Sequence, residues 1–342
     1  MEYTDYLKRH QLALRFLGLW PRPGSGLLHS GYGIYSVVFL GIFCAAFNVS
    51  EFVNFFFIYS ELKPFASDLC WFLLHFVGSF KIAVFLYKIK NVQEVYRRFR
   101  NGLFHLDFKR GIEEEMIIDH AVKKSLRYLV VYYAFSVAIL LNGFVAPAYR
   151  EHGNQNENLN SNITRSIQRL PYYTYVYCDA DLSPCYEIAY VYQILSTCIS
   201  SLVVIHCDNL YIILVMLCCS EFKILRRSLE TIAPRDYNEY ETKDDLDREY
   251  LRRGINCVKH HHAILEVSEE IEDMYNLLIL AQFMSHLIQI CFQLFLVTEA
   301  SELFAVQLTF IHIIYNNVFS QSTKVSEAAY NAQWTSSPEP VK

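Results

Sequence analysis

The sequence has little of what marks soluble, disordered or fibrous proteins. Only 19% of its 342 residues are charged, compared with about 25% in an ordinary soluble chain. Glycine (12) and proline (9) are sparse and hydrophobic residues make up 53%, which excludes a disordered chain and a collagen-like repeat. Ten cysteines are too dilute for a small disulfide scaffold, and the net charge of −5 excludes a generally basic nucleic-acid-binding protein.

Signatures of catalysis and metal binding are also missing. The chain has no Walker loop, no GxSxG sequence and no HExxH sequence. The run His260-His261-His262 is a poor metal site, because consecutive helical residues point in three different directions. The sequence therefore predicts no enzyme activity, no cofactor and no metal.

Long apolar runs are what the sequence has instead. A helix needs about 20 residues to cross a hydrocarbon core of ~30 Å. Six runs are long and apolar enough: 31–50, 66–87, 128–148, 188–219, 277–298 and 303–319. The helix of the first run can continue to Tyr59. The predicted fold class is therefore an all-α, polytopic membrane helical bundle with six spans.

The distribution of positive charge predicts the orientation of this bundle. Alternate loops and the two termini carry 25 of the 30 Lys and Arg residues, whereas the opposite loops carry four. Because Lys and Arg collect on the cytoplasmic side, we expect a protein of the cell membrane with both termini in the cytoplasm. The domains are then a cytoplasmic segment (1–30), a transmembrane domain (31–319) with cytoplasmic helix extensions (220–276), and a cytoplasmic tail (320–342).

The loop between spans three and four supports the same orientation. It contains the sequon Asn162-Ile163-Thr164, which can be glycosylated only on the outer side. It also contains Cys178 and Cys185, which form either a disulfide in that oxidising compartment or two free thiols.

Two ionisable residues lie inside predicted spans, where charge usually marks function. Lys81 lies in span two and Asp208 in span four. The Lys81 side chain can either extend to the inner interface or pair with Asp208.

A further apolar stripe precedes span five. It consists of Val258, Leu265, Ile271, Met274 and Leu278, which recur at near-helical intervals. The stripe needs a partner, either in the same chain or in another subunit.

Two short stretches resemble the insect odorant receptor family. Residues 14–21, LRFLGLWP, resemble its N-terminal entry sequence, and Ser326-Glu327-Ala328-Ala329-Tyr330 with Trp334 resembles its cytoplasmic tail. The resemblance implies a subunit of a ligand-gated cation channel that assembles, usually as a tetramer, with an odorant receptor co-receptor. It also implies subunit contacts near Met274, Tyr330 and Trp334, and a seventh, pore-lining helix. Since the sequence after Trp334 is short and polar, we expect no pore helix within these residues.

The resemblance further implies a pocket for a small volatile organic ligand in the outer half of the bundle. Such pockets have apolar and aromatic walls with few polar groups. The predicted orientation then selects ten candidate ligand contacts: Trp71, Phe72, His75, Ser136, Phe144, Tyr190, Ile194, Thr197, Gln307 and Phe310.

Other functions remain open at this point. An insect gustatory receptor has the same architecture. A non-conducting membrane protein that regulates the co-receptor would also fit.

Overall fold

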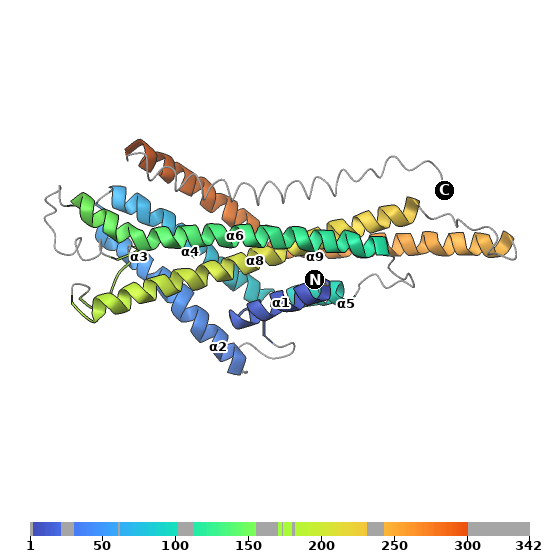
Figure 1. The fold of residues 1–342 in the computed structure, drawn as a ribbon, viewed down its shortest axis with the longest axis horizontal. Coiled ribbons are helices and arrows are strands. Elements are labelled where there is room, and N and C mark those ends of the chain that lie inside the picture. The colour runs from blue at the N-terminus through green and yellow to red at the C-terminus, as the bar shows by residue number, and fades with distance from the viewer. Residues whose placement is uncertain are drawn as a thin grey trace.

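The computed structural model describes residues 3–21, 31–60, 62–101, 112–154, 170–172, 174–179, 182–230 and 243–299. Within these ranges every regular element is a helix, which confirms the all-α class. The helices run roughly along one direction and form an elongated bundle (Figure 1). They are α1 (Tyr3–Phe16), α2 (Gly31–Leu40), the π-helical turn η1 (Gly41–Ala45), α3 (Ala46–Ile58), α4 (Leu62–Tyr87), α5 (Ile89–Asn101), α6 (Ile112–Asn154), α8 (Cys185–Glu230) and α9 (Lys243–Glu299).

Among the residues that the structure describes, five helical stretches are long and apolar enough to cross a membrane. They are Gly31–Ile58, Phe65–Tyr87, Glu114–Leu141, Cys185–Glu230 and Asp247–Leu296. All five overlap the first five predicted spans. The sixth predicted span, 303–319, lies outside the described residues.

The first span consists of α2, η1 and α3, which follow one another without a break. A π-helical turn alters the ladder of backbone hydrogen bonds and often marks a functional position. Here the Tyr192 hydroxyl of α8 donates to the carbonyl of Ile42 at 2.7 Å. The Asn48 side chain donates to the carbonyl of Cys44 at 3.1 Å. Side chains therefore satisfy the backbone at this turn and tie it to α8.

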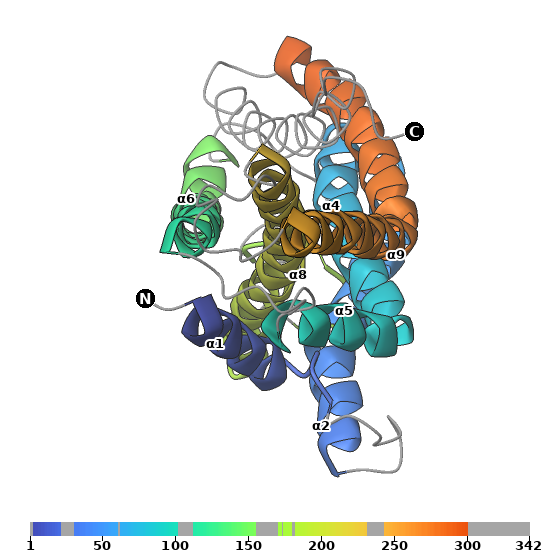
Figure 2. The ribbon, with the colours of Figure 1, turned by 90° about the vertical axis from the view of Figure 1, so that its right-hand side faces the viewer.

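Helix α8 is the central element of the bundle. It packs against α4, α6, α9, η1 and α1. In the view along the long axis, α1, α4, α6 and α9 lie around it (Figure 2). Its Leu210, Ile213 and Leu214 are completely buried. With 46 residues it is about 69 Å long, so it extends well beyond a hydrocarbon core of ~30 Å.

The N-terminal LRFLGLWP sequence ends α1 and attaches it to the bundle. Gly18 has a φ of 79°, a conformation that glycine adopts without steric cost, and the Leu19 amide donates back to the Leu14 carbonyl at 2.9 Å. Trp20 is buried and its ring meets that of Tyr96 in α5 edge to face, with centroids 5.1 Å apart. The sequence therefore works as a helix stop and as an anchor on α5.

The apolar stripe of α9 differs from its predicted register. Ile271, Met274 and Leu278 are buried, but Val258 and Leu265 are 58% and 39% exposed. The buried positions are instead Cys257, His260, Ile264, Val267, Ile271, Met274 and Leu278, which follow the three- and four-residue spacing of one helix face.

This face packs within the same chain, because α9 contacts α4, α5 and α8. Met274 is only 3% exposed and belongs to the main core. Met274 therefore packs in the core of its own chain, and the predicted subunit contact near it stays a prediction.

Candidate functional site

Three polar residues of α3 lie on one buried face. Asn48, Glu51 and Asn54 are three residues apart, a spacing that keeps side chains on neighbouring positions of a helix surface. Their exposed fractions are 9%, 0% and 0%. Burial of a carboxylate and two amides inside an apolar span is costly unless they are hydrogen-bonded, so their partners define the site.

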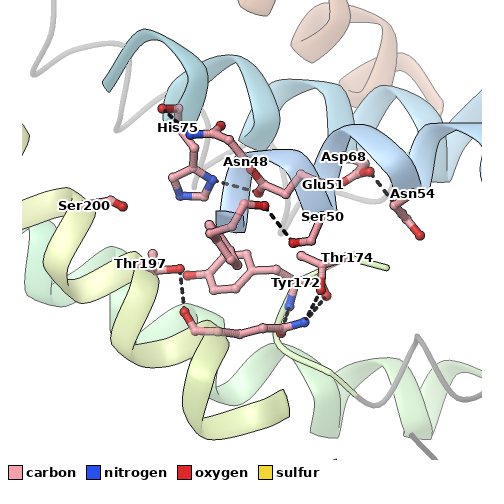
Figure 3. Close-up of polar contacts among 12 residues, drawn as sticks. Asn48, Ser50, Glu51, Asn54, Asp68, His75, Tyr172, Thr174, Thr197 and Ser200 are labelled. Carbon is pink, nitrogen blue, oxygen red and sulfur yellow. Dashed lines mark hydrogen bonds and ion pairs between the residues drawn. The ribbon is translucent and has the colours of Figure 1, made fainter. Parts of the chain in front are cut away.

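Helix α4 supplies those partners. His75 Nδ1 lies 2.7 Å from Glu51 Oε1, and the Asn48 amide donates to the His75 carbonyl at 3.1 Å. One turn further along α3, the Asn54 amide donates to Asp68 Oδ2 at 3.2 Å (Figure 3). We call Asn48, Glu51, Asn54, Asp68 and His75 the α3–α4 polar cluster.

A segment that precedes α8 covers this cluster. The Gln193 side chain accepts from the Tyr172 amide at 3.0 Å and donates to the Tyr172 carbonyl at 3.1 Å. It also donates to the Thr174 hydroxyl at 2.7 Å (Figure 3). The Tyr175 amide donates to the Ser50 carbonyl of α3 at 3.0 Å. Gln193 thus replaces a backbone partner and holds an irregular segment between α3 and α8.

Aromatic rings from three segments meet beside the polar cluster. The His75 ring lies with its centroid 5.1 Å from Phe47, 6.3 Å from Trp71 and 6.1 Å from Tyr172. The Trp71 and Tyr172 rings meet edge to face at 5.3 Å. These separations are typical of attractive aromatic pairs. We call Phe47, Trp71, His75 and Tyr172 the aromatic cluster.

Helix α6 approaches the cluster through a glycine. A Cβ atom placed on Gly143 would come 2.7 Å from the Tyr172 hydroxyl oxygen, which is closer than van der Waals contact. The absence of a side chain at Gly143 therefore leaves the space that the Tyr172 hydroxyl occupies.

The structure brings together some of the predicted ligand contacts. Trp71 and His75 belong to the aromatic cluster. Thr197 is 2% exposed and donates to the Gln193 carbonyl at 2.9 Å, and Ile194 of the same helix is also buried.

Other predicted contacts lie apart from this group. Phe72 faces a different flank, where its ring meets Phe52 and Phe55 at 6.0 and 5.1 Å. Adjacent helical residues point about 100° apart, so Phe72 cannot share the surroundings of Trp71. Tyr190 packs on a small cluster around Leu170.

Ser136 is half-buried on α6. The side chain of Phe144 and all of Gln307, Phe310, Asn162, Tyr330 and Trp334 lie outside what the structure describes.

Sequence reasoning missed Glu51, Asn48, Tyr172 and Gln193. A signal for the first two existed, since Asn48, Glu51 and Asn54 recur every three residues within an otherwise apolar run. No local signal marks Tyr172, because its place depends on the Gln193 side chain of another segment. Near this segment, Cys178 and Cys185 form a disulfide with a Cα–Cα distance of 6.2 Å.

A second polar network lies further along α8. Lys81 Nζ of α4 lies 2.7 Å from Asp208 Oδ1, and the Tyr132 hydroxyl of α6 donates to Asp208 Oδ2 at 3.2 Å. The Lys81 side chain is only 3% exposed, so it pairs with Asp208 rather than extending to the interface. This network joins three of the long helices.

Helix α1 joins the bundle next to this network. The Asn209 amide donates to the Tyr6 hydroxyl at 3.0 Å, and the Ser125 hydroxyl donates to Asn209 Oδ1 at 3.2 Å. The ring of His10 lies 5.2 Å from that of His206. Burial, with a further contribution from His206, lowers the pKa of His10 to about 3, so His10 is neutral near pH 7.

Comparison with known proteins identifies the family. The model of the 7tm Odorant receptor family matches residues 61–342. Odorant receptor 67c of Drosophila melanogaster is 28% identical over 138 residues, which are 37% of this chain and 32% of the relative. Putative odorant receptor 92a of the same species is 26% identical over 110 residues, 29% of this chain and 27% of the relative. The matched stretches thus span about a third or less of these relatives.

Solved structures show the same fold. The insect olfactory receptor OR5 from Machilis hrabei in complex with eugenol superposes with a TM-score of 0.68 at 11% identity, covering 94% of this chain and 77% of that one. A second structure of OR5 gives 0.68 at 13% identity and covers 96% and 81%. Because the family model matches most of its length, and its helices include five apolar spans, this chain is a multi-pass membrane protein that belongs to the odorant receptor family.

Proposed function

We propose that this chain is an odorant receptor subunit that binds a small volatile ligand at the aromatic cluster. The observation that carries the proposal is the convergence of Phe47, Trp71, His75 and Tyr172 from three separate segments beside a buried polar cluster. Small-ligand sites combine such apolar and aromatic walls with a few polar groups that fix orientation.

The charge distribution supports an outer location for this site and cytoplasmic termini. The aromatic cluster lies near the junction of α3 and α4, where only Lys63 is basic, whereas residues 88–127 beyond α4 carry ten Lys and Arg residues. The disulfide Cys178–Cys185 lies at the same end as the cluster, in agreement with an oxidising compartment there.

Helix α8 is a route by which binding can affect the rest of the bundle. Gln193 holds the segment of Tyr172, and Asp208 follows Gln193 by 15 residues, or about 22 Å along the helix. A displacement of α8 at the site would therefore reach the Lys81–Asp208 pair. We propose that this coupling opens a cation channel. The channel would be a hetero-tetramer formed with the odorant receptor co-receptor.

The test is to express the chain with a co-receptor and to record currents against an odorant panel. Trp71→Leu should raise the half-maximal concentration of activating odorants about tenfold, because an aromatic contact contributes about 0.5–1.5 kcal/mol beyond its buried area. Phe72→Leu is the matched control, since Phe72 is the neighbouring aromatic residue on another flank, and it should change the response much less.

Two outcomes would contradict the proposal. Equal effects of the two substitutions, at equal surface expression, would remove the aromatic cluster from ligand binding. Suppression of a co-receptor current without any response to odorants would instead favour a non-conducting regulatory subunit.

A further inference from the structure

The α3 face of the polar cluster has an excess of hydrogen-bond acceptors. Among the described residues, three of its buried oxygen atoms lack a hydrogen-bond partner: Asn48 Oδ1, Glu51 Oε2 and Asn54 Oδ1. A buried acceptor without a partner costs about 1–3 kcal/mol. The face therefore favours a ligand that donates hydrogen bonds.

The two amides have orientations that their surroundings fix. The Asn48 amide nitrogen faces the carbonyls of Cys44 and His75, each at 3.1 Å, and that of Asn54 faces the Asp68 carboxylate at 3.2 Å. Exchanging nitrogen and oxygen would bring acceptors against acceptors. The free atoms of both amides are thus oxygens.

Glu51 adds a carboxyl group to this donor-poor face. Its Oε1 atom is paired with His75 Nδ1 at 2.7 Å, while Oε2 has no hydrogen-bond partner and the side chain is fully buried. The rings of Phe47, Trp71 and Tyr172 surround His75. Aromatic faces attract ammonium groups, and the attraction is stronger where water is excluded.

From this arrangement we infer that the site recognises small organic amines, with the ammonium group donating to Glu51 Oε2 and the apolar body packing against the aromatic cluster. Alkyl amines are protonated near pH 7, as lysine is with a pKa of about 10.4, so one group supplies both a positive charge and an N–H donor for Glu51 Oε2. A hydrocarbon or ester of the same size would leave Glu51 Oε2 without a donor. This inference names the ligand class of the site and rests on the proposed function.

The experiment compares ligands that share one skeleton: 2-phenylethylamine, its neutral N-acetyl derivative, 2-phenylethanol and ethylbenzene. Binding is measured on the purified chain in lipid nanodiscs by the shift in thermal unfolding, and activation is measured as current with a co-receptor. For the wild type we expect the amine to bind at least tenfold more tightly than the other three compounds. The neutral amide keeps an N–H donor without the charge, so this comparison needs no variant.

Glu51→Gln then tests the carboxylate, with Glu221→Gln as the matched control. Glu221 is also buried and pairs with a histidine, His260, at 3.3 Å, but it lies near the far end of α8. E51Q should weaken amine binding at least tenfold and leave the binding of ethylbenzene, which has no donor, unchanged, whereas E221Q should leave both unchanged. If E51Q does not fold, the wild-type ligand series decides alone.

The outcomes separate the ligand class from the receptor function. Amine binding without current would support the inference and contradict the proposed channel role. Currents evoked by other odorants, with no preference for the amine, would overturn the inference and leave the receptor function standing. An equal loss for all four compounds in E51Q would also overturn it, because Glu51 would then only support the fold.

Discussion

The bundle should be strongly destabilised when one partner of the Lys81–Asp208 pair is removed and the other remains. Its two charged atoms lie 2.7 Å apart, and the side chains are 3% and 17% exposed. Removal of one partner leaves the other charge buried and uncompensated, which costs about 3–5 kcal/mol in comparable buried pairs. Lys81→Met, which keeps most of the side-chain volume, should therefore destabilise the chain by about this amount.

A double-mutant cycle separates the pair from its surroundings. Lys81→Met combined with Asp208→Leu removes both charges, and replacement of a complete buried pair by apolar residues is often neutral or stabilising. The double variant should therefore be more stable than Lys81→Met alone. The Tyr132 hydroxyl, which donates to Asp208, loses its partner in the double variant, so recovery should be incomplete.

The assay is unfolding of purified variants in mixed micelles at neutral pH. Lys123→Met is the control, because it breaks the exposed pair Lys123–Asp119, whose atoms are 2.6 Å apart, and exposed pairs contribute little. Equal small effects of Lys81→Met and Lys123→Met would contradict the expected cost of an unpaired buried charge. So would a double variant less stable than both single variants.

Three further predictions follow from local geometry. Gly143→Ala should displace Tyr172 and destabilise the chain by about 1–3 kcal/mol, as overpacked sites do, while Gly31→Ala, which meets no atom within 4 Å, should be tolerated; unfolding of both variants checks this. Gly18→Ala should cost about 1–2 kcal/mol, because φ is +79° there, and wild-type stability in that variant would refute the helix-stop role. The lowered pKa of His10, about 3, means that the unfolded chain binds this proton first as the pH falls below 6.5, so stability should decrease by roughly 1.4 kcal/mol per pH unit between 6.5 and 3. A His10→Gln variant should show a shallower decrease between pH 7.5 and 5.5 than the wild type, and parallel curves would contradict the burial argument.

The spans were predictable because they depend on local composition. Twenty apolar residues in a row satisfy the length of the bilayer whatever their neighbours are, and five of the six predicted runs correspond to described helices. The register of the α9 stripe could not be predicted in the same way, since Val258 and Leu265 are apolar yet lie outside the buried face. Hydrophobicity alone does not distinguish a residue that packs on another helix from one that faces outward.

The site was predictable only in part. Trp71 and His75 follow from their place in the outer half of the second predicted span, and the structure adds Tyr172 and Phe47 to them. The first predicted helix already continued to Tyr59, but Glu51 escaped because its partner His75 lies on another helix. The polar contacts of Gln193 connect segments distant in space, which no periodicity in the sequence encodes.

The most direct test of the central claim is an experimental structure of the receptor with an activating odorant bound. We expect ligand density in contact with Trp71 and Tyr172, and for an amine we expect the Glu51 carboxyl group within 3.2 Å of the ligand nitrogen, the usual range of such hydrogen bonds. Ligand density elsewhere in the bundle, with the aromatic cluster unchanged and closed, would contradict it.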